Sequence, residues 1–132
     1  MKVLLLEDSE QRHAWFKERF KDIDITDVPA EAIELLKKNS YDLICLDHDL
    51  EWSHYLTDCQ CKESTGLAVA KWLGENPDNN PKAKILIHSC NGPGSIRMQE
   101  SLNRPCTRIP FSYLIDIVGL TRLLKLVDWW DK

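Results

Sequence analysis

The chain has 132 residues, of which 43% are hydrophobic and 29% are charged, and its formal net charge is −4. These figures fit one globular domain spanning residues 1–132 and exclude a disordered chain. No apolar run is long enough to cross a bilayer, and no basic field marks a nucleic-acid backbone as the partner, so we expect no membrane partner.

Apolar runs and amphipathic stretches alternate along the chain, which predicts strands and helices in turn. In chain order the expected elements are a strand over residues 3–6, a helix capped by Ser9, a strand over residues 23–28, a helix from Pro29, a strand over residues 43–46, a helix opened by Thr65-Gly66, a strand over residues 85–87, a helix over residues 93–102, a strand over residues 108–113 and a closing helix over residues 117–130. The strand–helix alternation predicts an α/β fold: a five-stranded parallel sheet with helices on both faces, in a doubly wound, flavodoxin-like order. The first apolar run ends at Glu7-Asp8 without a cleavage site, so we interpret it as a buried strand rather than a signal peptide.

Polar side chains follow three of the apolar strands at their carboxyl ends, where ligands bind in open parallel sheets. They are Glu7 and Asp8 after the first strand, Asp47, His48 and Asp49 after residues 43–46, and His88, Ser89 and Asn91 after residues 85–87. Carboxylates gathered there are costly unless a cation neutralises them. Hard oxygen ligands favour Mg²⁺ or Mn²⁺ as the cofactor; the predicted ligands are Glu7, Asp8, Asp47 and Asp49.

Four segments resemble the receiver domains of response regulators. They are Leu4–Asp8, which resembles the first strand and its acidic pair, Tyr41–Asp47, the third strand and phosphoacceptor, Ile85–Ser89, the strand that ends at a phosphoryl-contacting Ser or Thr, and Pro110-Phe111. The resemblance implies a receiver-like fold over almost the whole chain. It also implies that Asp47 could accept a phosphoryl group from a histidine kinase.

The chain departs from ordinary receivers at several positions. Ile109 stands where the family has a lysine, and Arg108 could replace that lysine only if the backbone bulges, because neighbouring strand residues face opposite ways. The connection from Asp47 to Gly66 is longer than the usual one.

Two polar segments, Asp47-His48-Asp49 and His88-Ser89-Cys90-Asn91, resemble the signature of a divergent branch, the cyclic-phosphate processing receiver domains. That resemblance implies chemistry on a phosphoester rather than relay signalling. The expected ligand is a nucleotide or another phosphate-bearing small molecule, or an RNA end that carries a cyclic phosphate.

We therefore predict metal-dependent phosphoryl chemistry, in which Asp47 is a metal ligand or the nucleophile. His48 or His88 would move protons, because imidazole titrates near neutrality. The predicted phosphate-binding side chains are Ser89, Asn91 and Arg108, and a helix start nearby adds partial positive charge. Two alternatives stay open: a stand-alone receiver phosphorylated on Asp47, and a module that binds a phosphorylated ligand without turnover.

The segment Glu51–Ser64 is predicted to form a flap over the site, with a plain surface insertion as the alternative. A zinc site at His54, Cys59 and Cys61 is disfavoured, because these residues lack the paired spacing of structural zinc sites. Trp129-Trp130 either packs the last helix or forms a homodimer contact. The five cysteines are an odd number, which favours free thiols and a cytoplasmic location.

Overall fold

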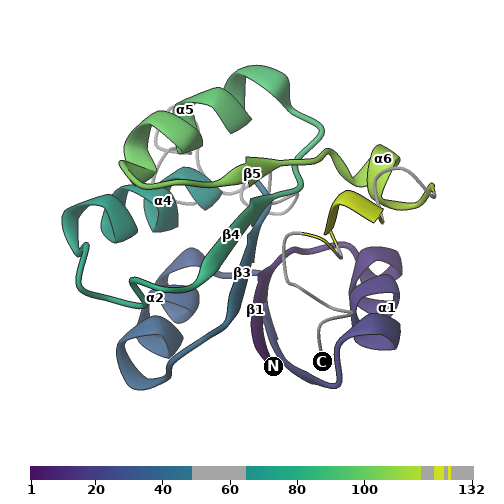
Figure 1. Cartoon of the computed structure of the whole chain (residues 1–132), viewed down its shortest axis with the longest axis horizontal. Coiled ribbons are helices and arrows are strands. Elements are labelled where there is room, and N and C mark those ends of the chain that lie inside the picture. The colour runs from purple at the N-terminus through teal and green to yellow at the C-terminus, as the bar shows by residue number, and fades with distance from the viewer. Residues whose placement is uncertain (49–64, 117–120, 124, 126–132) are drawn as a thin grey trace.

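Strands and helices alternate through the part of the chain that the computed structural model describes, residues 1–48, 65–116, 121–123 and 125 (Figure 1). The strands are β1 (Lys2–Leu6), β2 (Asp22–Thr26), β3 (Leu43–Leu46), β4 (Lys84–Ile87) and β5 (Thr107–Arg108). The helices are α1 (Glu10–Arg19), α2 (Pro29–Lys38), α4 (Gly66–Glu75), α5 (Gly92–Leu102) and α6 (Phe111–Leu114). No described helix has the length and apolar character that a membrane crossing requires.

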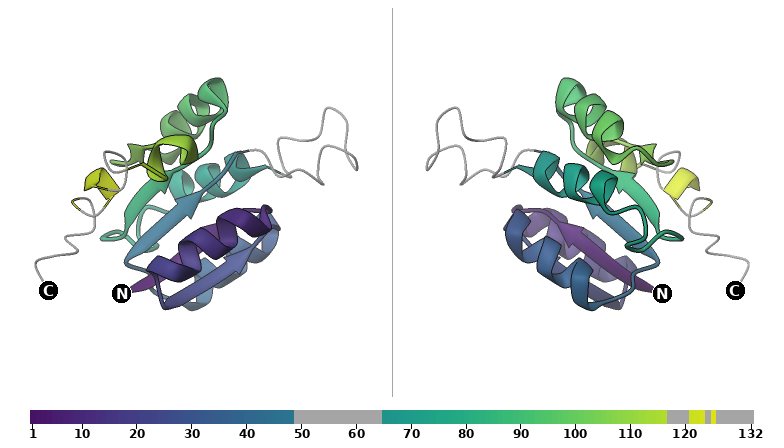
Figure 2. Two further views of the ribbon diagram at one scale, coloured as in Figure 1. Left: turned by 90° about the vertical axis from the view of Figure 1, so that its right-hand side faces the viewer. Right: turned by 90° about the vertical axis from the view of Figure 1, so that its left-hand side faces the viewer.

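The strands form one five-stranded sheet in the order β2-β1-β3-β4-β5, and every neighbouring pair is parallel. Helices cover both faces, with α1 on one side of the sheet and α2, α4 and α5 on the other (Figures 1 and 2). Because all strands run the same way, their carboxyl ends meet at one edge. The predicted fold class is confirmed.

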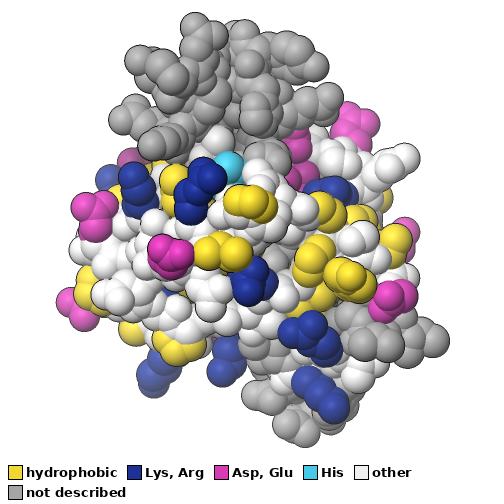
Figure 3. Space-filling model, turned by 90° about the horizontal axis from the view of Figure 1, so that it is seen from above, with side chains coloured by type: hydrophobic (Ala, Val, Ile, Leu, Met, Phe, Trp, Pro, Cys, Tyr) yellow, Lys and Arg dark blue, Asp and Glu magenta, His cyan; other side chains and the backbone are white. Residues whose placement is uncertain are grey.

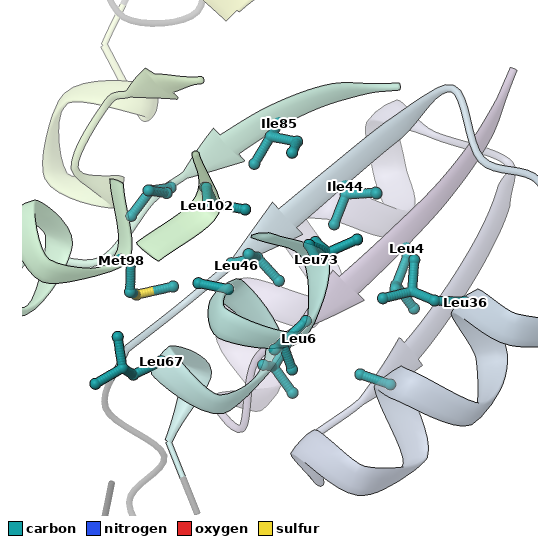
Figure 4. Close-up of a cluster of buried hydrophobic side chains, with 14 of the residues drawn as sticks. Leu4, Leu6, Leu36, Ile44, Leu46, Leu67, Leu73, Ile85, Met98 and Leu102 are labelled. Carbon is teal, nitrogen blue, oxygen red and sulfur yellow. The ribbon is translucent and has the colours of Figure 1, made fainter. Parts of the chain in front are cut away.

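Each face of the sheet has its own core, because successive strand side chains point to opposite faces. Leu4, Leu6, Ile44, Leu46, Ile85 and Ile87 pack under α2, α4 and α5 (Figure 4). The alternate residues Val3, Leu5, Leu43, Cys45 and Leu86 pack with Phe16 of α1 and with Phe20, the residue that caps the end of this helix. Strands covered on both faces explain the continuous apolar runs in the sequence.

Polar caps start the helices where the sequence predicted them. Ser9 Oγ accepts a hydrogen bond from the Arg12 N–H at 3.4 Å, and Thr65 Oγ1 accepts one from the Leu67 N–H at 3.3 Å. Pro29 begins α2, as its fixed φ angle favours.

Two predicted strand boundaries are wrong. The second strand stops at Thr26, whose Oγ1 accepts a hydrogen bond from the Val28 N–H at 3.1 Å, so the chain turns there. The last strand stops at Arg108, and α6 begins at Phe111. Pro110 lacks the N–H that a longer strand would need. The predicted closing helix over residues 117–130 lies largely outside the described residues.

The start of α4 is pressed against the end of β3. The Gly66 N–H donates to the His48 carbonyl at 3.0 Å, and a Cβ added at Gly66 would lie 1.9 Å from the Asp47 carbonyl oxygen. Only a residue without a side chain allows this approach.

Gly66→Ala is therefore expected to lower the free energy of unfolding by about 1–3 kcal/mol, through forced backbone displacement. Gly92→Ala is the matched control, because nothing lies within 4 Å of an added Cβ at that helix start; it should stay within about 1 kcal/mol of the wild type. Urea denaturation measures both. Equal stability of the two variants would contradict the close contact.

Candidate functional site

Three buried polar side chains meet where β1, β3 and β4 end. Glu7, Asp47 and His88 each follow the last residue of their strand, and each offers a ligand atom within 4.8 Å of the others. Because successive side chains of a strand point to opposite faces, these three side chains lie on the α1 side of the sheet. The residues two positions earlier, all in the α1-facing core, are Leu5, Cys45 and Leu86.

Glu7 is only 1% exposed, and both of its carboxylate oxygens are engaged. Oε2 accepts hydrogen bonds from the backbone N–H groups of Asp8 at 3.0 Å and Ser9 at 3.1 Å. Oε1 lies 2.9 Å from His88 Nε2 and 3.2 Å from Arg12 Nη1. Burial alone would raise the pKa of Glu7, but the contacts with His88, Ser9 and Arg12 lower this pKa to about 2. Glu7 is therefore held as a carboxylate.

Asp47 is 4% exposed, and its pKa is shifted in the opposite direction from that of Glu7. Burial, together with the neighbouring Glu7 carboxylate, raises the pKa of Asp47 to about 6, against the opposing effects of His88, Arg12 and a hydrogen bond with Ser89. Arg12 Nη1 lies 3.8 Å from Asp47 Oδ2. Two adjacent carboxylates that repel each other in this way attract additional positive charge.

An open hollow of about 500 Å³ lies over these carboxylates. It is lined by the residues that follow β1, by Gln11 and Arg12 of α1, by Asp47 and by residues 89–91. Viewed from above the molecule in Figure 1, the visible surface carries Lys, Arg, Asp and Glu side chains interspersed with hydrophobic ones (Figure 3).

The donor set fits a divalent cation. Asp8 and Asp47 both line the hollow, and carboxylate oxygens are the ligands that Mg²⁺ and Mn²⁺ prefer. Glu7 Oε1 could join them only if Arg12 moves, because hydrogen bonds already occupy it. The fourth predicted ligand, Asp49, lies outside the described residues.

The predicted phosphate-binding residues Ser89 and Asn91 are at the hollow. Ser89 is buried beside Asp47, and its Oγ accepts a hydrogen bond from the Asn91 N–H at 3.1 Å. Asn91 caps α5 by accepting from the Gly94 N–H at 3.0 Å, and its Nδ2 lies 3.5 Å from His48 Nδ1. The half-buried His48 ring lies against Gly94, where an added Cβ would come within 2.7 Å of it.

His88 is placed differently from His48. It is fully buried, its ring packs 5.2 Å from that of Phe16, and it does not line the hollow. Its Nε2 supports Glu7, while its Nδ1 has no hydrogen-bond partner among the described residues. His88 therefore orients Glu7 from behind, and the structure does not bring it to a ligand in the hollow.

Arg108 is not brought to the site, which corrects the sequence-based expectation. It pairs with Ile87, whose side chain faces α4 and α5, and it is exposed. The ladder continues regularly to the Ile109 N–H, which donates to the Ile87 carbonyl at 3.0 Å, so no bulge turns Arg108 around. Ile109, fully buried in the α1-facing core, takes the position on the Asp47 side.

Arg12 supplies the positive charge instead, and the sequence analysis missed it. Its guanidinium contacts Glu7 and Asp47 and lies 4.8 Å from the centre of the Phe111 ring. The signal was present in the sequence: the helix that follows a parallel strand begins at the ligand-binding edge, so its first turns point side chains there.

Several other expectations fall outside the described residues. These are the flap over residues 51–64, the disfavoured zinc site at His54, Cys59 and Cys61, and the Trp129-Trp130 contact. Within the described residues Cys45, Cys90 and Cys106 are free thiols. Burial raises the pKa of the Cys45 thiol, as expected for a cysteine that serves as a small core residue.

Comparisons with known proteins show similarity at the level of one family and of the fold. Residues 2–104 match the family described as Cyclic-phosphate processing Receiver domain. The fold is similar to a CheY-like response regulator receiver domain from Methylobacillus flagellatus (20% identity, 96% of this chain and 98% of that chain covered, TM-score 0.67). It is also similar to the response regulator TrrA from Thermotoga maritima in complex with Mg²⁺-BeF (22%, 96% and 99%, 0.65) and to the Mn²⁺-bound form of response regulator Rcp1 (22%, 95% and 87%, 0.57). No curated protein matches.

Proposed function

The chain belongs to the cyclic-phosphate processing receiver domains, and we propose that it performs metal-dependent phosphoryl chemistry, the hydrolysis of a cyclic phosphate on a nucleotide or an RNA end. One observation carries the proposal: a buried aspartate, Asp47, lies between Glu7, Arg12 and Ser89 on the floor of an open polar hollow. This arrangement provides a nucleophile, positive charge and hydrogen-bond donors at one place, which phosphoryl transfer requires.

Asp47 is proposed to act on the phosphorus atom directly. A carboxylate oxygen of Asp47 would attack phosphorus in line with one ester oxygen, and that P–O bond would break while the substrate stays attached through its other ester oxygen. Water would then hydrolyse this mixed anhydride, which releases the linear phosphate and restores the Asp47 carboxylate. Bound Mg²⁺ or Mn²⁺, held by Asp8, Asp47 and, once Arg12 has moved away, Glu7, would polarise a phosphoryl oxygen and offset its charge. The raised pKa of Asp47, about 6, still leaves it mainly ionised at pH 7.

His48, Ser89 and Asn91 would handle the oxygens of the substrate. The Ser89 hydroxyl, which is hydrogen-bonded with Asp47, could donate to a phosphoryl oxygen, and the Asn91 N–H holds this hydroxyl in place by donating to Ser89 Oγ. A neutral His48 whose Nδ1 accepts from Asn91 Nδ2, at 3.5 Å, carries its proton on Nε2. That proton is available for the departing ester oxygen.

A stand-alone receiver phosphorylated on Asp47 is the second candidate. The contact between Asp47 and Ser89 supports it, because receivers use such a pair. Against it, the position of the receiver lysine holds Ile109, which is buried among apolar side chains and offers no charge to an aspartyl phosphate. The same hollow could also serve a module that binds a phosphorylated ligand without turnover.

Purified protein incubated with Mg²⁺ or Mn²⁺ is expected to convert a cyclic phosphate to a linear one, and a chelator should stop the conversion. The panel contains 2′,3′-cyclic and 3′,5′-cyclic nucleotides, linear monophosphates, RNA with a 2′,3′-cyclic phosphate end, and acetyl phosphate. Chromatography detects product, and intact-protein mass spectrometry detects phosphorylation.

The outcomes separate the candidates. Phosphorylated protein from acetyl phosphate without any product favours the receiver, and ligand binding without product or phosphorylation favours the binding module. Conversion that persists unchanged in the chelator would exclude the metal-dependent mechanism.

A further inference from the structure

Arg12 bridges the two buried carboxylates of the site with a single nitrogen. Nη1 lies 3.2 Å from Glu7 Oε1 and 3.8 Å from Asp47 Oδ2. It therefore occupies the space between the two carboxylates, where a cation shared by them would also lie. Both charges cannot occupy this space, so binding of a divalent ion there must displace the guanidinium.

We propose that Arg12 is the resident counter-ion of the metal-free site and becomes its phosphate-binding side chain once a divalent cation displaces it from Glu7 and Asp47. The inference rests on the proposed function, because it assigns the residue that recognises the phosphate in the same hollow. It makes Arg12 a determinant of both metal affinity and anion affinity, with opposite effects on the two.

The surroundings of Arg12 allow such a shift. Its guanidinium lies over the Phe111 ring, 4.8 Å from the ring centre. This contact attracts the positive charge but does not fix the direction in which the N–H groups point. Nη2 lies 4.0 Å from Cys90 Sγ, so the group already extends across the hollow toward residues 89–91. The side chain remains 27% exposed. A small movement along the ring face would bring it to oxygens held by Ser89.

The charge in the hollow gives Arg12 this role by elimination. Among the described residues that line the hollow, Arg12 is the only basic one, against the carboxylates of Glu7, Asp8 and Asp47. A phosphate entering this site would meet excess negative charge until a divalent ion balances the carboxylates. The released guanidinium could then bind two phosphate oxygens at once, as its planar geometry favours.

Two affinities test the proposal, measured by calorimetry: that of Mn²⁺ alone and that of inorganic phosphate at saturating Mn²⁺. Arg12→Gln is expected to bind Mn²⁺ about tenfold more tightly, since the competing cation is gone, and phosphate at least about tenfold more weakly. Arg12→Lys keeps the positive charge but loses the planar pair of N–H donors that can bind two phosphate oxygens. Its Mn²⁺ affinity should therefore stay near that of the wild type while its phosphate affinity falls.

Arg19→Gln is the matched control. Arg19 lies on the same helix and stacks on an aromatic ring in the same way, 4.0 Å from the centre of Trp15, but it is paired with Glu18 away from the hollow. Both affinities should be unchanged in this variant. Thermal unfolding checks that every variant is folded, and Arg12→Lys provides the test if Arg12→Gln is not.

Weaker Mn²⁺ binding by Arg12→Gln, or unchanged phosphate affinity in both Arg12 variants, would overturn the inference. Wild-type protein that binds no Mn²⁺ would overturn it together with the proposed metal-dependent chemistry. The two claims can also fail separately. Turnover with unaltered affinities in the Arg12 variants removes the inference alone, whereas the expected affinity changes without any turnover remove only the enzymatic activity.

Discussion

Replacing Asp47 with Asn is expected to reduce cyclic-phosphate turnover by on the order of 10³-fold or more, because the amide is neither a nucleophile nor a charged ligand. The same change should make the protein more stable at neutral pH. Asp47 is 4% exposed, and its pKa is raised to about 6 by burial and by Glu7, so ionisation of Asp47 costs the folded state free energy. A shift of this size from 3.8 corresponds to roughly 3 kcal/mol.

The stability gain has a definite pH window. The folded state holds a proton on Asp47 more tightly than the unfolded state, so this cost is fully present above about pH 6 and disappears as the pH falls to about 4. Asp47→Asn should therefore exceed the wild type by about 1–3 kcal/mol at pH 7 and match it near pH 4. Denaturant unfolding at both pH values measures this. A variant less stable than the wild type at pH 7 would mean that Arg12 stabilises Asp47 more than burial destabilises it.

Glu7→Gln is expected to have the opposite effect and to destabilise the protein by about 3–5 kcal/mol at pH 7. Glu7 is 1% exposed, and contacts with His88, Ser9 and Arg12 outweigh its burial and lower its pKa to about 2. The amide would leave His88 without its carboxylate partner and Arg12 with Asp47 alone.

The contribution of Glu7 to stability also changes with pH in the opposite direction from that of Asp47. Its stabilisation is complete above the ordinary carboxyl pKa of 4.5 and is lost as the pH falls toward 2, so the difference between variant and wild type should shrink in that range. Glu100→Gln, on the exposed side of α5, is the control and should stay within about 0.5 kcal/mol of the wild type. A loss below 1 kcal/mol in Glu7→Gln would contradict the tightly held carboxylate.

The sheet could be predicted from the sequence because its inner strands are covered on both faces and read as unbroken apolar runs. Val3–Leu6, Leu43–Leu46 and Ile85–Ile87 all occur as such runs. The edge strand β5 has only two residues, Thr107–Arg108, so no periodicity marks its end. Apolar residues after Pro110 were read as strand, although they belong to α6.

The acidic residues of the site could also be located, since the ends of parallel strands meet at one edge. The roles of the basic residues could not be predicted from the sequence. Arg12 comes from a helix, and its distance from Asp47 depends on how α1 packs on the sheet. Arg108 directly precedes Ile109, which stands at the position of the family's lysine, but neighbouring strand residues point to opposite faces, so Arg108 points away from the site. The same alternation, applied to His88, would have placed it with the buried core rather than with His48.

The hydrogen bond from the Gly66 N–H to the His48 carbonyl, 3.0 Å long, brings the two ends of the intervening stretch to one point beside the site. Extra chain between these ends adds little closure entropy, about 0.6 kcal/mol for each doubling of length. We therefore expect a change in the length of the chain between these ends to leave the positions of Asp47 and α4 unaltered. For protein engineering, the same junction is a place to graft a reporter domain whose output would follow what binds next to Asp47.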